Sequence, residues 1–123
     1  LLSGGELTVK LDRNTLKRRG GRNTEYLLAL ALELENKGML YGIACDSDGL
    51  DGSSGAAGAL VTPNTTQRIR KAGMFPEVYL KQHAAAEAFE FTKELIKTGP
   101  TRTNLNDFRC AYLSSGDPPR VGL

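Results

Sequence analysis

Apolar and polar positions follow two different periods along the chain, and together they predict strands that alternate with helices. Residues 7–11 alternate between apolar and polar side chains, which is typical of a half-buried strand. Residues 39–45 form an almost continuous apolar run that predicts a buried strand, and residues 108–113 predict a closing strand. The small residues of 56–61 are compatible with either a helix start or a short strand.

The longest predicted helix starts at Asn23, which suits an N-cap, and runs through the apolar residues 26–32 to a stop at Gly38. Its first half is apolar on nearly every side, unlike a helix that buries a single stripe. We therefore expect either a second helix layer or another domain to cover it. The polar, glycine-containing residues 12–22 before it predict a mobile loop that could act as a lid.

Two further helices are predicted from spacing and stop signals. Residues 65–72 predict a short helix that is broken at Phe75-Pro76, and residues 84–97 predict an amphipathic helix ended by Gly99-Pro100. Strands alternating with helices predict an α/β fold, a layered domain with a mixed β-sheet flanked by helices. We expect this domain to span residues 1–113, with a tail at residues 114–123.

Composition narrows the class of protein. The chain has 123 residues, 40% hydrophobic and 24% charged, which fits one globular domain. Sixteen basic and fourteen acidic side chains give a net charge of +2, which does not by itself predict a nucleic-acid or membrane partner. The basic cluster at residues 17–19 is interpreted as a solvated turn, with a phosphate-facing role as the alternative. We expect Cys45 and Cys110 to be buried thiols, since no zinc spacing is present.

The first residues contain no basic start and no apolar core of a signal peptide, and no apolar run reaches transmembrane length. We therefore expect a cytoplasmic protein. The chain begins with Leu1 in a segment that reads as the end of a strand, so we also expect it to be a piece of a longer protein.

The strongest site candidate is the segment 46–55, where three aspartates and three glycines follow the predicted strand 39–45 directly. Glycines let a backbone approach a ligand closely, and aspartates offer oxygens to a cation or to hydroxyl groups. The aspartates of this segment are therefore candidates for binding a cation. The alternative interpretation is an ordinary Asp/Gly turn.

Four polar, glycine-bearing segments stand at element junctions, at residues 3–6, 20–23, 46–55 and 99–107. We expect them to converge at one edge of the sheet and to hold an anionic or polyhydroxylated ligand. Arg22 is the candidate donor fork, because its charge is disfavoured beside a helix N-terminus unless an anion lies near. A plain surface arginine is the alternative. His83 is interpreted as a helix-start residue without catalytic partners, and the chain contains neither a Walker loop nor a dinucleotide fingerprint.

In chain order, Ser-Gly-Gly-Glu, Gly-Gly-Arg-Asn-x-Glu, Ser-Asp-Gly-Leu-Asp-Gly and Gly-Pro-Thr-x-Thr-Asn-x-Asn-Asp resemble the MOFRL domain. That is the C-terminal domain of a class of glycerate kinases often labelled hydroxypyruvate reductase. The resemblance covers Leu1 to about Leu113. It implies a two-domain enzyme whose larger N-terminal domain adjoins this one across a cleft, where ATP and Mg²⁺ would act on D-glycerate to yield 2-phosphoglycerate.

The resemblance also assigns roles to residues. Arg22 matches the active-site arginine of the family and would stabilise charge on the phosphoryl group or on the glycerate carboxylate. The resemblance implies Asp48 or Asp51 as the possible metal ligand. The chain departs from the family pattern at Thr24, Asp46, Gly55, Arg102 and residues 83–86. The residues expected to bind substrate or phosphate are Ser3, Gly4, Gly5, Glu6, Asn23, Asp48, Asp51, Thr101, Thr103, Asn104 and Asp107.

Two other functions stay open at this point. The first is a hydroxypyruvate reductase of hydroxyacid or tartrate metabolism, which the family's second label suggests. The second is a non-catalytic ligand-binding or assembly domain, and a homodimer is left open in every case.

Overall fold

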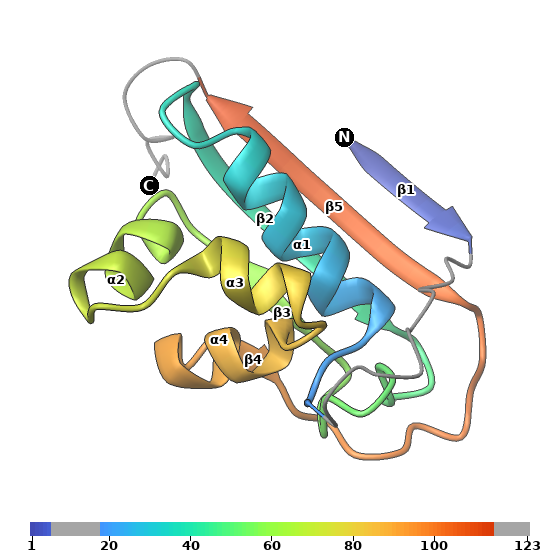
Figure 1. The fold of residues 1–123 in the computed structure, drawn as a ribbon. Helices are drawn as coiled ribbons and strands as arrows, with labels where there is room; N and C mark the ends of the chain where they lie inside the picture. Colours follow the sequence, from blue (N-terminus) through green and yellow to red (C-terminus); the bar gives the residue numbers. More distant parts are fainter. Residues whose placement is uncertain (6–17, 115–123) are drawn as a thin grey trace.

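A computed structural model describes residues 1–5 and 18–114 (Figure 1). The predicted strand 7–11, Glu6, Lys17, most of the predicted loop 12–22 and the tail from residue 115 on lie outside the described residues. Among the described residues, no helix is long and apolar enough to cross a membrane.

The described strands form one five-stranded sheet in the order β1-β5-β2-β3-β4. All pairings between them are antiparallel, so the layered α/β prediction is confirmed while the sheet is antiparallel where a mixed sheet was predicted. The turn-rich segment between β2 and β3 reverses the chain, which makes these neighbours antiparallel. The strands are β1 (Leu2–Gly5), β2 (Met39–Asp46), β3 (Gly58–Val61), β4 (Leu95–Ile96) and β5 (Asp107–Ser114).

The structure decides the segment 56–61 in favour of a strand. Gly58 pairs with Cys45, and a Cβ built at Gly58 would lie 1.9 Å from the carbonyl oxygen of Ala44. Only glycine therefore permits β3 to lie this close to β2.

The helices are α1 (Arg22–Glu33), α2 (Thr65–Lys71), α3 (Pro76–Lys81) and α4 (Ala85–Thr92). In Figure 1 they lie in front of the sheet, and α1 packs along β2 and β3. The side chains of Leu27, Leu28, Ile69 and Phe89 are fully buried between these elements. The first half of α1 is apolar on nearly every side because other helices pack around it. Of the two predicted alternatives, a second helix layer or another domain, the structure shows the helix layer.

Four details of the predicted helices were wrong, and one of them is the end of α1, which lies at Glu33 and not at Gly38. The helix α1 begins at Arg22 with Gly21 at its N-cap, not with Asn23. The helix α3 was not predicted, because Phe75-Pro76 was interpreted as a break although proline suits the first turn of a helix. The last helix ends at Thr92, and Lys93 follows with a left-handed φ of 61°, because the next residues turn into strand β4.

The segment before α1 is bound to α4. Arg18 donates from Nε to both carboxylate oxygens of Glu87 at 3.0 Å, and Arg19 is paired with Glu90. The described part of the basic cluster is therefore bound to α4 and is not a freely solvated turn. The phosphate-facing alternative stays a prediction. Cys45 is half-buried and Cys110 is exposed, so the prediction of a buried thiol is wrong for Cys110.

Candidate active site

The candidate site lies at the edge of the sheet where β2 ends and β5 begins. Asp46, the last residue of β2, is paired in register with Asp107, the first residue of β5. Both side chains are almost fully buried, and the N-terminus of α1 brings Arg22 onto them. Three of the four glycine-bearing segments therefore contribute to one place, as the sequence predicted.

Arg22 is held by both carboxylates. Its Nε donates to Oδ1 and Oδ2 of Asp107 at 2.9 Å, and its Nη2 is paired with Oδ2 of Asp46. The Arg22 side chain is 24% exposed. Two carboxylates from different strands therefore fix the direction of a guanidinium that solvent can still reach. The anion that this position calls for is supplied within the domain itself, by Asp46 and Asp107.

Asp107 also contacts a second arginine, Arg109. Arg109 lies two residues further along β5 on the same side of the sheet, and its Nη1 lies 3.5 Å from Oδ2 of Asp107. Arg109 donates from Nε to Oγ of Ser3 at 3.1 Å and from Nη2 to the carbonyl of Gly4 at 2.9 Å. Through Arg109, the predicted residues Ser3 and Gly4 are tied to the cluster. Gly5 pairs with Asp107 in the ladder.

Asp51 has a different place from the one predicted. Its side chain is fully buried, and it accepts the backbone N–H groups of Asn23 and Thr24 at 2.9 Å each. It therefore caps α1 from a distant loop and leaves the Asn23 side chain free of capping. Gly21 is required here, because a Cβ at this position would lie 2.4 Å from the Asp51 carboxylate.

Arg22 together with Asp46 and Asp107 is called the arginine clamp below. Asn23 connects this clamp to Asp51, the carboxylate that caps α1. Its Nδ2 lies 2.9 Å from Oδ1 of Asp107 and 3.3 Å from Oδ1 of Asp51. This orientation of the amide is required, since the reverse one would place its oxygen against two carboxylates. Oδ1 of Asn23 is buried and has no hydrogen-bond partner among the described residues. Such an acceptor is costly unless a donor reaches it.

The other predicted residues lie on two neighbouring loops that meet at Ser47. These loops, residues 47–50 and 101–106, are called the loop pair below. Thr101 donates to the carbonyl of Ser47, and the backbone N–H of Thr101 donates to the carbonyl of Asp48 at 3.1 Å. The Thr103 hydroxyl lies 3.1 Å from that of Thr101, and Asn104 accepts the N–H of Asn106 at 3.2 Å. These side chains are exposed and shape the loop.

Asp46 links the loop pair to the arginine clamp. Oδ1 of Asp46 accepts the backbone N–H of Asp48 at 3.2 Å, while Oδ2 faces Arg22. Burial raises the pKa of Asp46, and this effect exceeds the opposing influence of the Asp48 amide and the Arg22 charge. The cluster of Arg22, Arg109, Asp46 and Asp107 pairs two cations with two acids.

A metal centre is not evident in the described ranges. They contain no group of three or more His, Cys, Asp or Glu residues that could hold a metal ion. Both oxygens of Asp51 are engaged by α1, which leaves Asp48 as the more accessible of the two predicted candidates.

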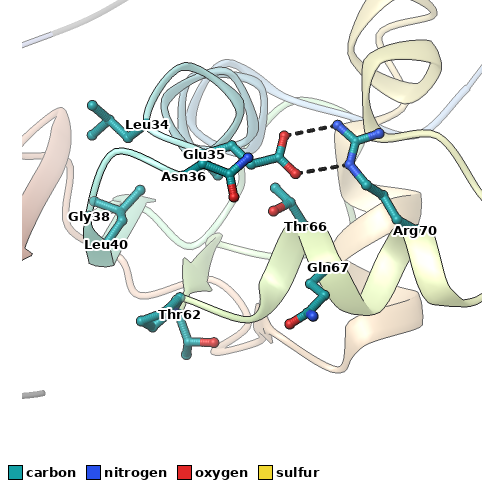
Figure 2. A pocket seen from close by; sticks show the side chains of 11 residues that line it. Leu34, Glu35, Asn36, Gly38, Leu40, Thr62, Thr66, Gln67 and Arg70 are labelled. Carbon is teal, nitrogen blue, oxygen red and sulfur yellow. Dashed lines mark hydrogen bonds and ion pairs between the residues drawn. The ribbon is translucent and has the colours of Figure 1, made fainter. Parts of the chain in front are cut away.

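A hollow of about 240 Å³ lies elsewhere, between the C-terminal end of α1 and α2 (Figure 2). Glu35 and Arg70 face each other across it, with both oxygens of Glu35 accepting bonds of 2.9 Å. No predicted site residue lines this hollow. The two partners satisfy each other there, so the arginine clamp remains the better site candidate.

Sequence analysis placed Asp46 and Ser47 within the candidate segment 46–55 without singling them out, and it missed Arg109 as a functional residue. A signal existed for Arg109, because a charged side chain at a sheet position that faces the helix layer needs a partner. His83 has a partner too: its Nδ1 lies 3.1 Å from Oε1 of Glu25 on α1. His83 thus contacts the carboxylate at the start of α1 and lies away from Arg22's clamp.

Comparison with known proteins places this geometry in a family. The MOFRL family matches residues 1–107. A "Putative hydroxypyruvate reductase" of Agrobacterium vitis is 50% identical over 92% of this chain and 26% of its own length. A "Glycerate 2-kinase" of Pyrococcus horikoshii is 36% identical over 94% of this chain and 26% of its own length.

A solved structure agrees with these relatives. The crystal structure of a glycerate kinase from Thermotoga maritima superimposes with a TM-score of 0.81 at 34% identity, over 91% of this chain and 26% of that one. The chain thus spans about a quarter of the length of the relatives it matches. Because the family match covers most of the chain and the fold agrees, the chain belongs to the MOFRL family.

Proposed function

We propose that this domain is the C-terminal part of an ATP-dependent glycerate 2-kinase, which phosphorylates D-glycerate to 2-phosphoglycerate, and that it forms one wall of the interdomain active site. The observation that carries the proposal is the Arg22 clamp. A partly exposed guanidinium is held by two buried carboxylates at the start of α1, where anions are favoured. Relatives named glycerate 2-kinase support the assignment.

Arg22 is proposed as the catalytic residue of this wall. Phosphoryl transfer needs positioning and the neutralisation of charge on non-bridging oxygens more than it needs covalent help from the protein. Arg22 would donate to a phosphoryl oxygen or to the glycerate carboxylate, and the dipole of α1 would add to its charge. Asp107 would act as a positioning residue, because it receives the Nε of Arg22 with both oxygens.

Substrate contacts are proposed for the loop pair and the β1 turn. The half-buried Asp48 and the exposed Thr101, Thr103 and Asn104 lie on one rim next to the clamp, where hydroxyl and carboxylate groups could meet the polar groups of a hydroxyacid. Ser3, Gly4 and Gly5 hold Arg109 and would support the clamp from the other side. Glu6 remains a predicted contact.

The polar groups of this wall suit an anion better than a metal ion. ATP would supply the transferred phosphoryl group, and Mg²⁺ would neutralise its charge when bound. Arg22 and the α1 N-terminus suit an anion, and the orphaned Oδ1 of Asn23 suits a donor from a substrate, a water or the N-terminal domain. The described ranges contain no group of three or more His, Cys, Asp or Glu residues that could hold a metal ion. We therefore assign no magnesium ligand to this wall. As for location, we propose a cytoplasmic protein.

A second candidate is a hydroxypyruvate reductase of hydroxyacid or tartrate metabolism. The observation in its favour is the name of the Agrobacterium vitis relative at 50% identity. A reductase would consume NADH or NADPH with hydroxypyruvate, whereas a kinase would not. Following the oxidation of these cofactors at 340 nm separates the two functions.

The decisive experiment is phosphorylation of D-glycerate by the full-length protein. Wild type, Arg22→Ala and Arg22→Lys are compared, and the position of the phosphate is read by phosphorus NMR. Arg19→Ala is the matched control, because Arg19 is an exposed arginine of the same segment, paired with Glu90. We expect loss of activity with Arg22→Ala by about 100-fold or more, partial loss with Arg22→Lys and none with the control. An inactive wild type, or an unaffected Arg22→Ala, would refute the proposal.

A further inference from the structure

The face of the sheet that lies away from the helices carries an uncharged surface. Side chains alternate between the two faces of each strand, and paired residues share a face. Asp46, Asp107 and Arg109 point to the helix side, so the alternate positions form the outer face. Within the described strands these positions are Leu2, Gly4, Met39, Tyr41, Ile43, Cys45, Gly58, Leu60, Ile96, Phe108, Cys110, Tyr112 and Ser114.

None of these outer-face positions in the described strands carries a charge. Several large apolar side chains on it are strongly exposed, among them Leu2 at 67%, Phe108 at 45% and Tyr112 at 52%. Antiparallel sheets that face water on one side usually show polar residues there. An apolar patch of several hundred Å² on a soluble domain marks a contact surface.

We propose that the outer face is covered by the remaining, N-terminal part of the same polypeptide. The relatives extend to about four times the length matched here, so a large body of chain adjoins this domain in them. Strands about 4.8 Å apart with a rise of about 3.4 Å per residue give the face a flat projected area of roughly 400 Å², and its side chains offer somewhat more accessible surface than that. A stable dimer buries roughly 800 Å² on each partner.

The size of the face therefore favours a tethered occupant over a second copy. A segment of the same chain does not lose the translational freedom that two separate molecules lose on binding, so a smaller area suffices. This interface is distinct from the Arg22 clamp, which opens at the strand ends on the helix side. The proposal does not depend on kinase activity, and the two can fail separately.

Cys110 reports directly on this face, because its thiol is exposed in the domain and points outward. The full-length protein is treated with N-ethylmaleimide, and modification of Cys110 is followed by mass spectrometry of its tryptic peptide. We expect labelling in the native protein at least about tenfold slower than in urea, independent of protein concentration. Labelling within about twofold of the unfolded rate would overturn the proposal.

Two measurements identify other occupants. Protection that rises with protein concentration together with the mass from light scattering would assign the face to a second copy. Protection that disappears when residues 115–123 are deleted would assign it to that segment. Either result overturns the proposal.

A pair of charge insertions adds an independent test. Tyr112→Lys lies on the outer face, whereas Phe91→Lys lies on α4 at a nearly equal exposure of 50%. In the full-length protein we expect Tyr112→Lys to lower the melting temperature by several degrees and to speed the labelling of Cys110, because a charge would be buried. Phe91→Lys should change neither. Equal effects of the two substitutions would contradict the proposed interface.

Discussion

The Nε of Arg22 lies 2.9 Å from both carboxylate oxygens of Asp107, across 85 positions of sequence. This contact joins the first helix to the last strand and sets the direction of the proposed catalytic cation. It ties the chemistry of the site to the correct register between β5 and β2, since that register places Asp107 beside Asp46.

Replacing Asp107 should disable Arg22 without removing it. Asp107→Asn keeps the shape of the side chain and loses the charge that holds the guanidinium, so we expect kcat for D-glycerate phosphorylation to fall by about 10- to 100-fold. KM should change less than kcat if Asp107 only positions Arg22. Steady-state kinetics of the full-length protein measure both constants, and unchanged kcat would show that the clamp is not needed for catalysis.

Replacing Asp46 should improve substrate binding, in contrast to the loss of activity expected on replacing Asp107. Its buried carboxylate lies beside Arg22 and repels an anionic substrate that approaches the same guanidinium. Removing a charge about 4 Å away at high dielectric is worth about 1 kcal/mol, so we expect Asp46→Asn to lower KM for glycerate by about fivefold. Because the pKa of Asp46 is raised, wild type should bind glycerate better as pH falls, and the variant should lack this trend. A higher KM in Asp46→Asn would mean that Asp46 mainly orients Arg22.

Asp51 and Asp48 form a matched pair for stability. Asp51→Ala leaves two buried N–H groups of α1 without an acceptor, and we expect a loss of about 2–4 kcal/mol. Asp48 accepts the N–H of Leu50 at an exposed turn, so Asp48→Ala should cost less than about 1 kcal/mol. Urea denaturation followed by circular dichroism measures both, and equal losses would contradict the capping role of Asp51.

Gly21 should tolerate no side chain. A Cβ there would lie 2.3 Å from the Asp51 carbonyl oxygen, so Gly21→Ala should displace the cap, destabilise the protein and lower activity. Gly73→Ala is the control, because Gly73 has a φ of +81° but open space around it and should cost only about 1 kcal/mol of backbone strain. Thermal unfolding and glycerate kinase assays separate the two, and a harmless Gly21→Ala would refute this packing.

Acid should weaken the fold through two ion pairs. Hydrogen bonds from Arg70 lower the pKa of Glu35, and hydrogen bonds from Arg18 lower the pKa of Glu87. Carboxyl groups with a depressed folded-state pKa stabilise the protein above their unfolded pKa of about 4.3, and this stability disappears as pH falls through the folded pKa. Urea midpoints should therefore drop below pH 5. In the double variant Glu35→Gln, Glu87→Gln the urea midpoint should fall less steeply with decreasing pH. The control Glu33→Gln, whose side chain is 78% exposed, should leave this pH dependence unchanged.

Local signals in the sequence predicted several parts of the fold. The apolar runs at 39–45 and 108–113 became β2 and β5, and the helix from residue 22 or 23 was found, because these segments carry their periodicity in adjacent residues. The order of the four motifs predicted the family. It also predicted Arg22, Asn23 and Asp107 as site residues, and these three side chains lie together in the structure. These features depend on residue type and spacing, which the sequence contains in full.

Only the tertiary structure shows which contact each motif residue makes. Asp51 caps a helix 28 positions before it, and Asp46 lies against Arg22, since both relations depend on where distant segments meet in space. The antiparallel sheet and the strand β4 likewise depend on long-range pairing, which no local window reports. The short α3 is different, because the local signal of Pro76 at its first turn was present and was misinterpreted. Sequence by itself indicated most of the groups that the site contains, and folding decided that Asp51 caps α1 while Asp46 and Asp107 hold Arg22.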